Sequence, residues 1–325
     1  MKDIGAAARR LAPTLDRLVS VHQLRLLTAV IERGGFSRAA SALGLSQPAI
    51  SHQLKALSGT IGTPVLEIIG RRVQLTQAGA LLYEHAKRIL AEFEAAGSAL
   101  DELRGLQRGR LRVAGDTTVG IYVLPDLLGA FRHAHPSIEV HLGVDNRQGL
   151  YERLVAGEVD FVVSGRRWED PSIALVVRPF LANELIAIAS PRHPLAGRDH
   201  VTLADLAAEP FIVREPGSGT RETAEEALRA AGLSIRPVME LASNGAIKRA
   251  VAQDLGVSIL SRYATALELQ IGHLAELSVE GFPLRRQWHL VYARDKRLGP
   301  VDEAFLRFVD DGRWKETIGH PITTD

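Results

Sequence analysis

The chain has no cysteine among its 325 residues and no long apolar run. Without cysteine it holds neither a disulfide framework nor a thiolate metal site, a composition that fits a reducing cytoplasm. No apolar stretch approaches the roughly 20 residues of a membrane-spanning helix. The first 20 residues contain Arg9, Arg10 and Arg17 and lack the apolar core of a signal peptide. We therefore expect a cytoplasmic, globular protein with no membrane partner.

Familiar catalytic motifs are absent as well. The sequence holds no G-x-S-x-G and no H-E-x-x-H. His133, His135 and His141 suggest metal spacing, but the first two lie near an expected helix end and the third on an expected strand. We interpret them as surface histidines. The sequence thus predicts a protein that is not an enzyme and that carries no metal and no cofactor.

Charge is divided unevenly along the chain, although the net charge is only +1. Residues 1–110 carry 15 Lys and Arg against 9 Asp and Glu, a net charge of +6, and the remainder carries −5. Chance scatter is one explanation of this division. The other is a nucleic-acid-binding head on an acidic body.

Three helical patterns follow one another between residues 22 and 59. The second has Ser37 as its expected N-cap and closes at Gly44. The spacing of Ala40, Gly44 and Ile50 is typical of a helix-turn-helix. A small residue lets the two helices approach, glycine allows the positive φ of the turn, and the β-branched residue fills the core between them.

The third pattern, from Ser46 to Gly59, is the expected recognition helix, with Ser46 as its N-cap. Residues 65–76 predict two short strands around a Gly70-Arg71-Arg72 turn, which would form a basic wing. The alternative is an exposed hairpin whose arginines are merely solvated. Phosphate contacts from such arginines supply affinity, whereas Gln47 can pair bidentately with adenine and so choose sequence.

Ten residues of this head are predicted to contact DNA, although each of them could instead be an ordinary solvated side chain. They are Ser37, Arg38, Ser46, Gln47, Pro48, Ser51, His52, Lys55, Arg71 and Arg72.

A long helical run follows Thr76, with apolar residues spaced alternately by four and three positions. This period of 3.5 predicts a coiled-coil seam and hence a partner helix, with packing against the chain's own body as the alternative. The predicted dimerisation residues are Leu82, Ala86, Ile89, Phe93, Ala96, Leu100 and Leu103.

From Leu111 onward, expected strands alternate with helical stretches, which predicts an α/β body of two small lobes with mainly parallel sheets. The expected strands are 111–115, 138–144, 159–165, 185–190, 211–215, 238–243, 257–261 and 288–293.

The stretch "VREPGSGTRE", residues 213–222, places glycines between two arginines, just ahead of a helical segment with Thr220 as its expected cap. Unpaired N–H groups at a helix start attract an anion. The stretch lacks the G-K-[ST] ending of a P-loop and the third glycine of a dinucleotide fingerprint. A ligand-free glycine-rich cap is the alternative.

Polar residues that follow other strands favour the anion, because ligands of open α/β sheets bind at the carboxyl ends of strands. The predicted effector-binding residues are Thr117, Thr118, Asn146, Arg147, Gly165, Arg166, Arg214, Gly217, Ser218, Gly219, Thr220, Arg221 and Asn244.

The segments "FSRAASALGLSQPAISHQLKAL" and "GRRVQLTQAG" closely resemble the DNA-binding head of LysR-type transcriptional regulators. "GRLRVAG", "LPDLLGAFRHAHPSIEVHLG", "LVAGEVDFVVSG" and "AVAQDLGVSILS" look like the effector-binding body of that family. Within it, "REPGSGTRE", "ELASNGAIKRAVAQDLG" and "EGFPLRRQWHLVYAR" look most like regulators of Calvin-cycle, carbon-fixation operons. A departure is "LSGTIGTPVLE", which stands where the family usually has acidic residues and an aromatic.

The resemblance implies a mixed fold: an N-terminal, all-α winged helix-turn-helix, a long linker helix, and a C-terminal α/β, two-lobed, periplasmic-binding-protein-like effector domain. The expected domains are an extension at 1–20, the head at 21–79, the linker helix at 80–109, the effector domain at 110–315 and a tail at 316–325. Lobe I would take about 110–181 and 284–315, and lobe II about 182–283.

The implied function is a regulator whose cleft senses a small anionic metabolite and alters promoter binding or activation. The implied partners are a double-stranded DNA operator, a phosphorylated or carboxylated metabolite, RNA polymerase, and a second copy of the chain in a homodimer or homotetramer. A solute-binding protein and an α/β enzyme are the rival classes. The first needs a signal segment and no helix-turn-helix, and the second needs a catalytic constellation.

Overall fold

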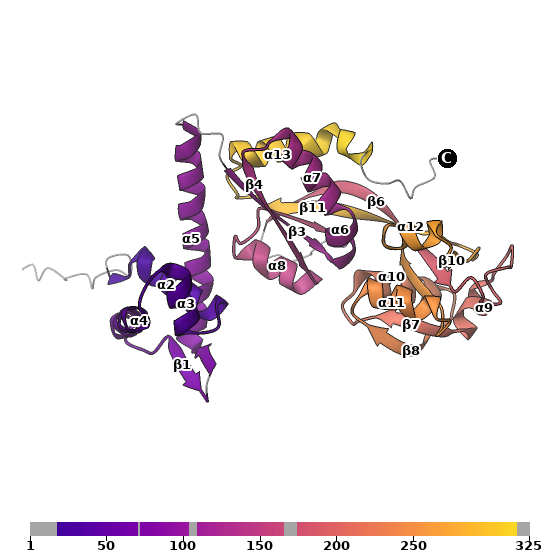
Figure 1. The fold of residues 1–325 in the computed structure, drawn as a ribbon, viewed down its shortest axis with the longest axis horizontal. Helices are drawn as coiled ribbons and strands as arrows, with labels where there is room; N and C mark the ends of the chain where they lie inside the picture. Colours follow the sequence, from indigo (N-terminus) through magenta and orange to yellow (C-terminus); the bar gives the residue numbers. More distant parts are fainter. Residues whose placement is uncertain (1–17, 71, 104–108, 166–173, 317–325) are drawn as a thin grey trace, which may run out of the picture. The chain divides into compact units, whose positions relative to one another are not determined.

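The computed structural model describes residues 18–70, 72–103, 109–165 and 174–316. The chain divides near Gly97 into two compact parts, which we call the head and the body and describe separately (Figure 1). No helix of the described ranges is both long and apolar enough to cross a membrane.

The head is built on three helices, α2 (Val21–Glu32), α3 (Phe36–Leu43) and α4 (Gln47–Ile61). Ser20 begins α2 with a capping box: its hydroxyl accepts the backbone N–H of Gln23, whose side-chain oxygen accepts the Ser20 N–H. The helices enclose a core in which Leu27, Ile50 and Leu57 are fully buried. Burial of such side chains stabilises the head by about 1.5–3 kcal/mol each.

The turn between α3 and α4 has the predicted chemistry. Gly44 adopts φ +66° after α3, and Ser46 caps α4 by accepting the Ala49 N–H. Ser37, however, is not the N-cap of α3. Gly35 occupies that position, and the helix already includes Ser37, so its hydroxyl is free to donate to Gln47 Oε1 at 3.2 Å.

The wing is an antiparallel hairpin of β1 (Leu66–Ile69) and β2 (Arg72–Leu75). Val65, just before it, donates its N–H to Ser58 Oγ on α4 and accepts the Thr76 N–H, so both ends of the hairpin are fixed. The 27-residue helix α5 (Gln77–Leu103) follows directly.

Lobe I of the body is a sheet covered on both faces. Its strands β3 (Gly109–Asp116), β4 (Ile138–Asp145) and β5 (Phe161–Ser164) are parallel. Its helices are α6 (Thr117–Tyr122), α7 (Leu124–Ala134), α8 (Arg147–Val155), α13 (Pro300–Asp311) and the 3₁₀ helix η1 (Arg313–Glu316). Residues of α7, α13 and η1 share one hydrophobic core with the sheet, and residues of α8 share another.

Lobe II holds its own cores. Its strands are β7 (Pro210–Arg214), β8 (Arg236–Leu241), β9 (Ser258–Ser261) and β10 (Ala275–Glu276). Its helices are α9 (Leu203–Ala208), α10 (Gly219–Ala230), α11 (Asn244–Ala252) and α12 (Arg262–Gln270). Residues of α9 and α10 belong to one core, and residues of α11 belong to the other.

Two long strands connect the lobes, β6 (Leu175–Ala189) and β11 (Leu284–Ala293) (Figure 1). They pair antiparallel with each other, β6 also pairs antiparallel with β9 and β10, and β11 with β5. The prediction of mainly parallel sheets was therefore wrong. The chain leaves lobe I along β6 and returns to it along β11, so the two strands run in opposite directions. The sheet is mixed, because β11 pairs antiparallel with β5, which is itself parallel to β3.

Candidate functional site

The predicted DNA-contacting side chains lie together at the helix-turn-helix. Ser37, Arg38 and the six residues named on or at the start of α4 are exposed, as is Arg72 on the wing. In this state Gln47 Oε1 accepts the Ser37 hydroxyl. Arg71 lies outside the described residues. The apolar side of each helix packs in the core of the head, so the polar side faces solvent and can contact DNA.

The predicted dimerisation residues of α5 are packed at the start of the helix and exposed farther along it. Leu82 packs against the core of the head, and Ala86 is buried. Ile89, Phe93 and Leu100 are 40%, 56% and 57% exposed within the single chain, and Ala96 is exposed too. The side chain of Leu103 is outside the description. The exposed stretch is an apolar stripe of the kind that pairs with another helix.

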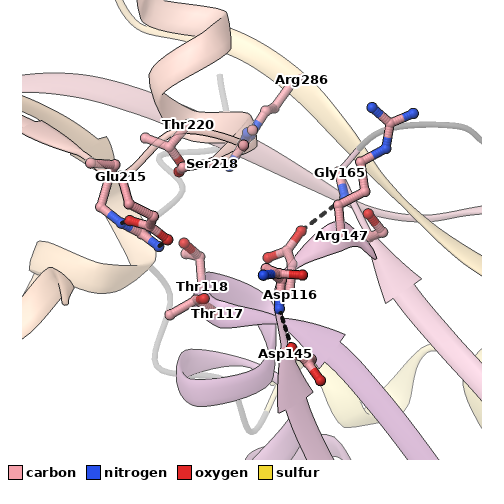
Figure 2. A pocket seen from close by; sticks show the side chains of 15 residues that line it. Asp116, Thr117, Thr118, Asp145, Arg147, Gly165, Glu215, Ser218, Thr220 and Arg286 are labelled. Atoms are coloured by element: carbon pink, nitrogen blue, oxygen red, sulfur yellow. Dashed lines mark hydrogen bonds and ion pairs between the residues drawn. The ribbon is translucent and has the colours of Figure 1, made fainter. Parts of the chain in front are cut away.

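A pocket lies where strands of the body end and helices begin, and its roughly 470 Å³ of empty space includes open solvent (Figure 2). The predicted residues that line it are Thr117, Thr118, Asn146, Arg147, Gly165, Arg214, Gly217, Ser218, Gly219 and Thr220. The prediction missed five further lining residues, Asp116, Asp145, Ser164, Glu215 and Arg286.

Local structure explains why these residues meet. The carboxyl ends of β3, β4, β5 and β7 reach the pocket, and so do the first residues of α6, α8 and α10. The first N–H groups of a helix have no partner within it, and the helix dipole places partial positive charge there. The starts of α8 and α10 at one pocket therefore favour a negatively charged ligand.

Asp116 is a structural residue of this pocket. One carboxylate oxygen accepts the Val119 N–H at 3.3 Å and so caps α6, and the other accepts the Gly165 N–H at 3.0 Å. It thereby ties the end of β3 to the residue after β5 (Figure 2). Asp116 directly follows the expected strand 111–115, and an aspartate at that position is a common helix cap, so the sequence could have indicated it.

Arg214 contributes the most buried charge. Its side chain is 4% exposed, and it donates Nε and Nη2 to the two carboxylate oxygens of Glu215, both at 2.7 Å. Its Nη1 donates to Asn244 Oδ1 at 2.8 Å, and Asn244 Nδ2 donates to Thr118 Oγ1 at 3.4 Å. Asn244 thus acts behind the pocket, where it connects the guanidinium to the start of α6.

Arg286 reaches the pocket from β11. Its Nη2 donates to Thr220 Oγ1 at 3.1 Å, and Thr220 itself is 4% exposed. Thr220 is therefore not the helix cap that the sequence predicted. Ser218 holds the N-cap position of α10, and Thr220 lies inside the first turn.

Arg221 is a predicted effector-binding residue that the structure places elsewhere. It does not line the pocket, because its guanidinium donates to Glu225 and Glu240, each at 2.7 Å, and to the backbone oxygen of Arg214. These hydrogen bonds to carboxylates raise its pKa above the ordinary value. Its role is structural. Arg166 lies outside the described residues.

The three histidines singled out in the sequence each have a local neighbour. His133 bonds the Gly129 carbonyl, His135 contacts the Phe131 ring, and His141 pairs with Glu139. In the part of the chain that the structure describes, no group of three or more His, Asp or Glu is placed to hold a metal ion.

The head and the pocket together define a DNA-binding protein whose body accommodates a ligand. Residues 21–80 match the family model "Bacterial regulatory helix-turn-helix protein, lysR family", and residues 104–313 match "LysR substrate binding domain". The chain belongs to the LysR family of transcriptional regulators.

Similar proteins include a transcriptional activator and a regulator of a RuBisCO operon. The chain is 41% identical to the HTH-type transcriptional activator CmpR of Synechocystis over 290 residues, which cover 89% of this chain and 94% of that protein. It is also 41% identical to the RuBisCO operon transcriptional regulator of Allochromatium vinosum, with 90% and 95% covered.

Two solved structures are similar as well. The regulatory domain of Synechocystis CcmR, in complex with 2-PG, matches with a TM-score of 0.59 at 36% identity, covering 63% of this chain and 97% of that one. Full-length CbnR with its target DNA matches with a TM-score of 0.69 at 25% identity, covering 90% and 99%.

Proposed function

We propose that the pocket of the body binds a small metabolite with a phosphate or carboxylate group, and that this binding alters how the head acts at a promoter. The observation that carries the proposal is the convergence of the starts of α8 and α10 with Arg147, Arg214 and Arg286 on one pocket. Guanidinium groups bind oxyanions with paired, charge-assisted hydrogen bonds. The 2-PG complex of the CcmR regulatory domain supports the same ligand class.

The bound metabolite is a signal in this proposal and is released unchanged. Ligand binding shifts the equilibrium between arrangements of the two lobes only as far as the ligand prefers one of them. Thr118 and Asn244 already meet across the lobes, as do Thr220 and Arg286, so the ligand would bind among groups whose contacts change when the lobes move.

Replacing Arg214 by alanine should weaken binding of 2-PG by about 10- to 150-fold, which corresponds to about 1.5–3 kcal/mol for hydrogen bonds to a charged group. Arg229→Ala is the matched control, because Arg229 is an exposed arginine of α10 that does not line the pocket. Its affinity should stay within twofold of the parent. Titration calorimetry on both variants measures the difference, and equal affinities in Arg214→Ala and the parent would refute the site.

For the head, we propose that α4 enters the major groove, that Gln47 reads a base, and that Arg72, Lys55 and Arg38 neutralise phosphates. The exposure of this surface and the DNA complex of CbnR support the proposal.

Gln47→Ala should lower the discrimination between the preferred base and the others at one position of the site by about 1–3 kcal/mol, because a bidentate amide contact is lost. Arg72→Ala should weaken all duplexes alike and lower the slope of log affinity against log salt by about one. Selection from a pool of randomised duplexes, together with a salt titration on one duplex, separates the two effects. An unchanged consensus for Gln47→Ala would contradict this placement of the recognition helix.

We further propose that α5 pairs with the same helix of a second chain through Ile89, Phe93, Ala96 and Leu100, and that such homodimers associate into tetramers. The exposed apolar stripe supports this assembly, and sedimentation of the purified chain tests it. We also propose that the domains have the limits given from the sequence. The regulator would act in the cytoplasm and contact RNA polymerase there. Because a dimer presents two recognition helices, its operator should be partly palindromic.

A further inference from the structure

Glu215 occupies an unexpected place for a pocket that binds anions. Its carboxylate lines the pocket, and both of its oxygens lie 2.7 Å from Arg214 nitrogens. This is the fork-to-fork geometry that an effector carboxylate or phosphate would itself adopt on an arginine. The position that an anionic ligand needs is therefore filled by a side chain of the protein.

Burial explains why Arg214 requires a counter-anion at all times. The guanidinium carries a positive charge and is 4% exposed. An arginine left unpaired at such a site costs several kcal/mol. Asn244 accepts one of its N–H groups but carries no charge. Glu215 alone among the described partners of this guanidinium brings a negative charge.

The other carboxylates of the pocket are held by backbone groups. Asp116 accepts the N–H groups of Val119 and Gly165, and Asp145 accepts the Asn146 N–H at 2.8 Å (Figure 2). The hydrogen bonds of the Glu215 carboxylate in the described structure go only to Arg214. Its side chain is 28% exposed, and its rotatable bonds allow it to move without a change of backbone.

Among the described lining residues, positive and negative charges are equal in number before a ligand arrives. The described lining residues include three carboxylates, on Asp116, Asp145 and Glu215, and three guanidinium groups. A phosphate or carboxylate that entered with Glu215 in place would add unbalanced negative charge close to 2.7 Å ion pairs. An anion that replaced Glu215 on Arg214 would keep the balance at that guanidinium.

We propose that Glu215 is an internal competitor of the effector, and that binding exchanges the Glu215 carboxylate on Arg214 for an oxyanion of the ligand. The inference rests on the proposed function of the pocket. It makes Glu215 a specificity-determining residue. A neutral molecule cannot take its place on the buried guanidinium, whereas a small carboxylate or phosphate can, and the affinity measured for the ligand is reduced by the strength of the internal pair.

The test is titration calorimetry of the full chain with 2-PG and, separately, with inorganic phosphate. Glu215→Gln preserves the shape of the side chain and removes its charge. We expect it to bind 2-PG at least about tenfold more tightly than the parent, which corresponds to about 1.4 kcal/mol. Glu225→Gln is the matched control, because Glu225 pairs with Arg221, which does not line the pocket. Its affinity should be unchanged within twofold.

Thermal denaturation provides a second measurement. Without ligand, Glu215→Gln should melt below the parent, because the buried arginine has lost its counter-charge, and saturating 2-PG should raise its midpoint more than it raises that of the parent. Should Glu215→Gln fail to fold, Glu215→Asp keeps the charge but shortens the side chain and should show a smaller gain in affinity.

The outcomes distinguish the two proposals. If the parent binds 2-PG and Glu215→Gln binds it equally or more weakly, the exchange is refuted and the anion site stands. If only Glu215→Gln binds, the internal carboxylate is the stronger competitor and the exchange is supported. If neither protein binds 2-PG or phosphate at millimolar concentration, the anion site and the exchange fail together.

Discussion

Replacing Asp160 by alanine is expected to lower the free energy of unfolding of the body by about 3–5 kcal/mol, the loss that follows when one member of a buried ion pair is removed. The Asp160 side chain is 8% exposed. It accepts the Arg112 backbone N–H at 2.8 Å and Arg112 Nη2 at 3.1 Å, and it pairs with Lys296 Nζ at 2.7 Å. With alanine at this position, Arg112 and Lys296 would both lose the carboxylate that they share.

The measurement is urea unfolding followed by tryptophan fluorescence. All three tryptophans lie after residue 160, and Trp288 and Trp314 are buried in the body, so this signal does not report on the head. Glu303→Ala is the control, because its ion pair with Arg307 is exposed and contributes about 1 kcal/mol or less. Similar losses in the two variants would contradict the importance of burial at Asp160.

The same group gives a pH dependence with a defined sign. Burial alone would raise the pKa of Asp160, but the nearby Lys296 and Arg112 outweigh burial and leave it below the ordinary value. The folded carboxyl therefore releases its proton more readily than the unfolded one. Its stabilising contribution is complete above about pH 4, near the unfolded pKa, and disappears as the pH falls through the lower folded pKa. The difference between the parent and Asp160→Asn should shrink accordingly in acid.

Replacing Gly79 by alanine is expected to destabilise the head by about 1–3 kcal/mol and to weaken DNA binding at least tenfold. A methyl group at this position would lie 1.8 Å from the carbonyl oxygen of Val65. That oxygen already accepts the Thr76 N–H, and Val65 is fully buried, so backbone must move at the base of the wing. Such overpacking commonly costs 1–3 kcal/mol.

Gly97→Ala on the same helix is the control. A methyl group there meets no atom within 4 Å, and alanine inside a helix is more stable than glycine by about 0.5–1 kcal/mol. Thermal melting by circular dichroism and fluorescence anisotropy with a labelled duplex would compare the two variants. Parental melting and parental DNA affinity in Gly79→Ala would show that the wing tolerates the shift.

The sequence predicted features whose causes are local. Ser46 and Gly44 act within one turn of their own helices, and most expected strands appear within a few residues of their predicted limits. Strand ends followed by polar residues correctly placed Thr118 and Arg147 at the pocket, because the carboxyl ends of parallel strands meet at one edge.

Features that depend on distant segments or on helix rotation could not be predicted in this way. Arg286 arrives on a strand 66 residues after Thr220, which it contacts, and only the register of β6 and β11 brings it there. Arg221 follows Thr220 directly, but each residue of a helix turns by about 100°, so neighbours in the sequence face different surroundings. A pair of adjacent charges, Arg214 and Glu215, does not reveal from sequence alone whether they face each other or an incoming ligand.

The two strands that pass through both lobes restrict how the body can deform. A hydrogen-bonded pair of antiparallel strands twists and bends with little loss, but it resists being stretched or slid along its length, because sliding would break the register that joins Leu284 to Leu185 and Ala293 to Leu175. A lobe movement that preserves this pairing is therefore a change of angle at nearly constant separation. Under the proposed function, ligand binding would act through such a rotation, and its size would be limited by how far β6 and β11 can twist before their pairing fails.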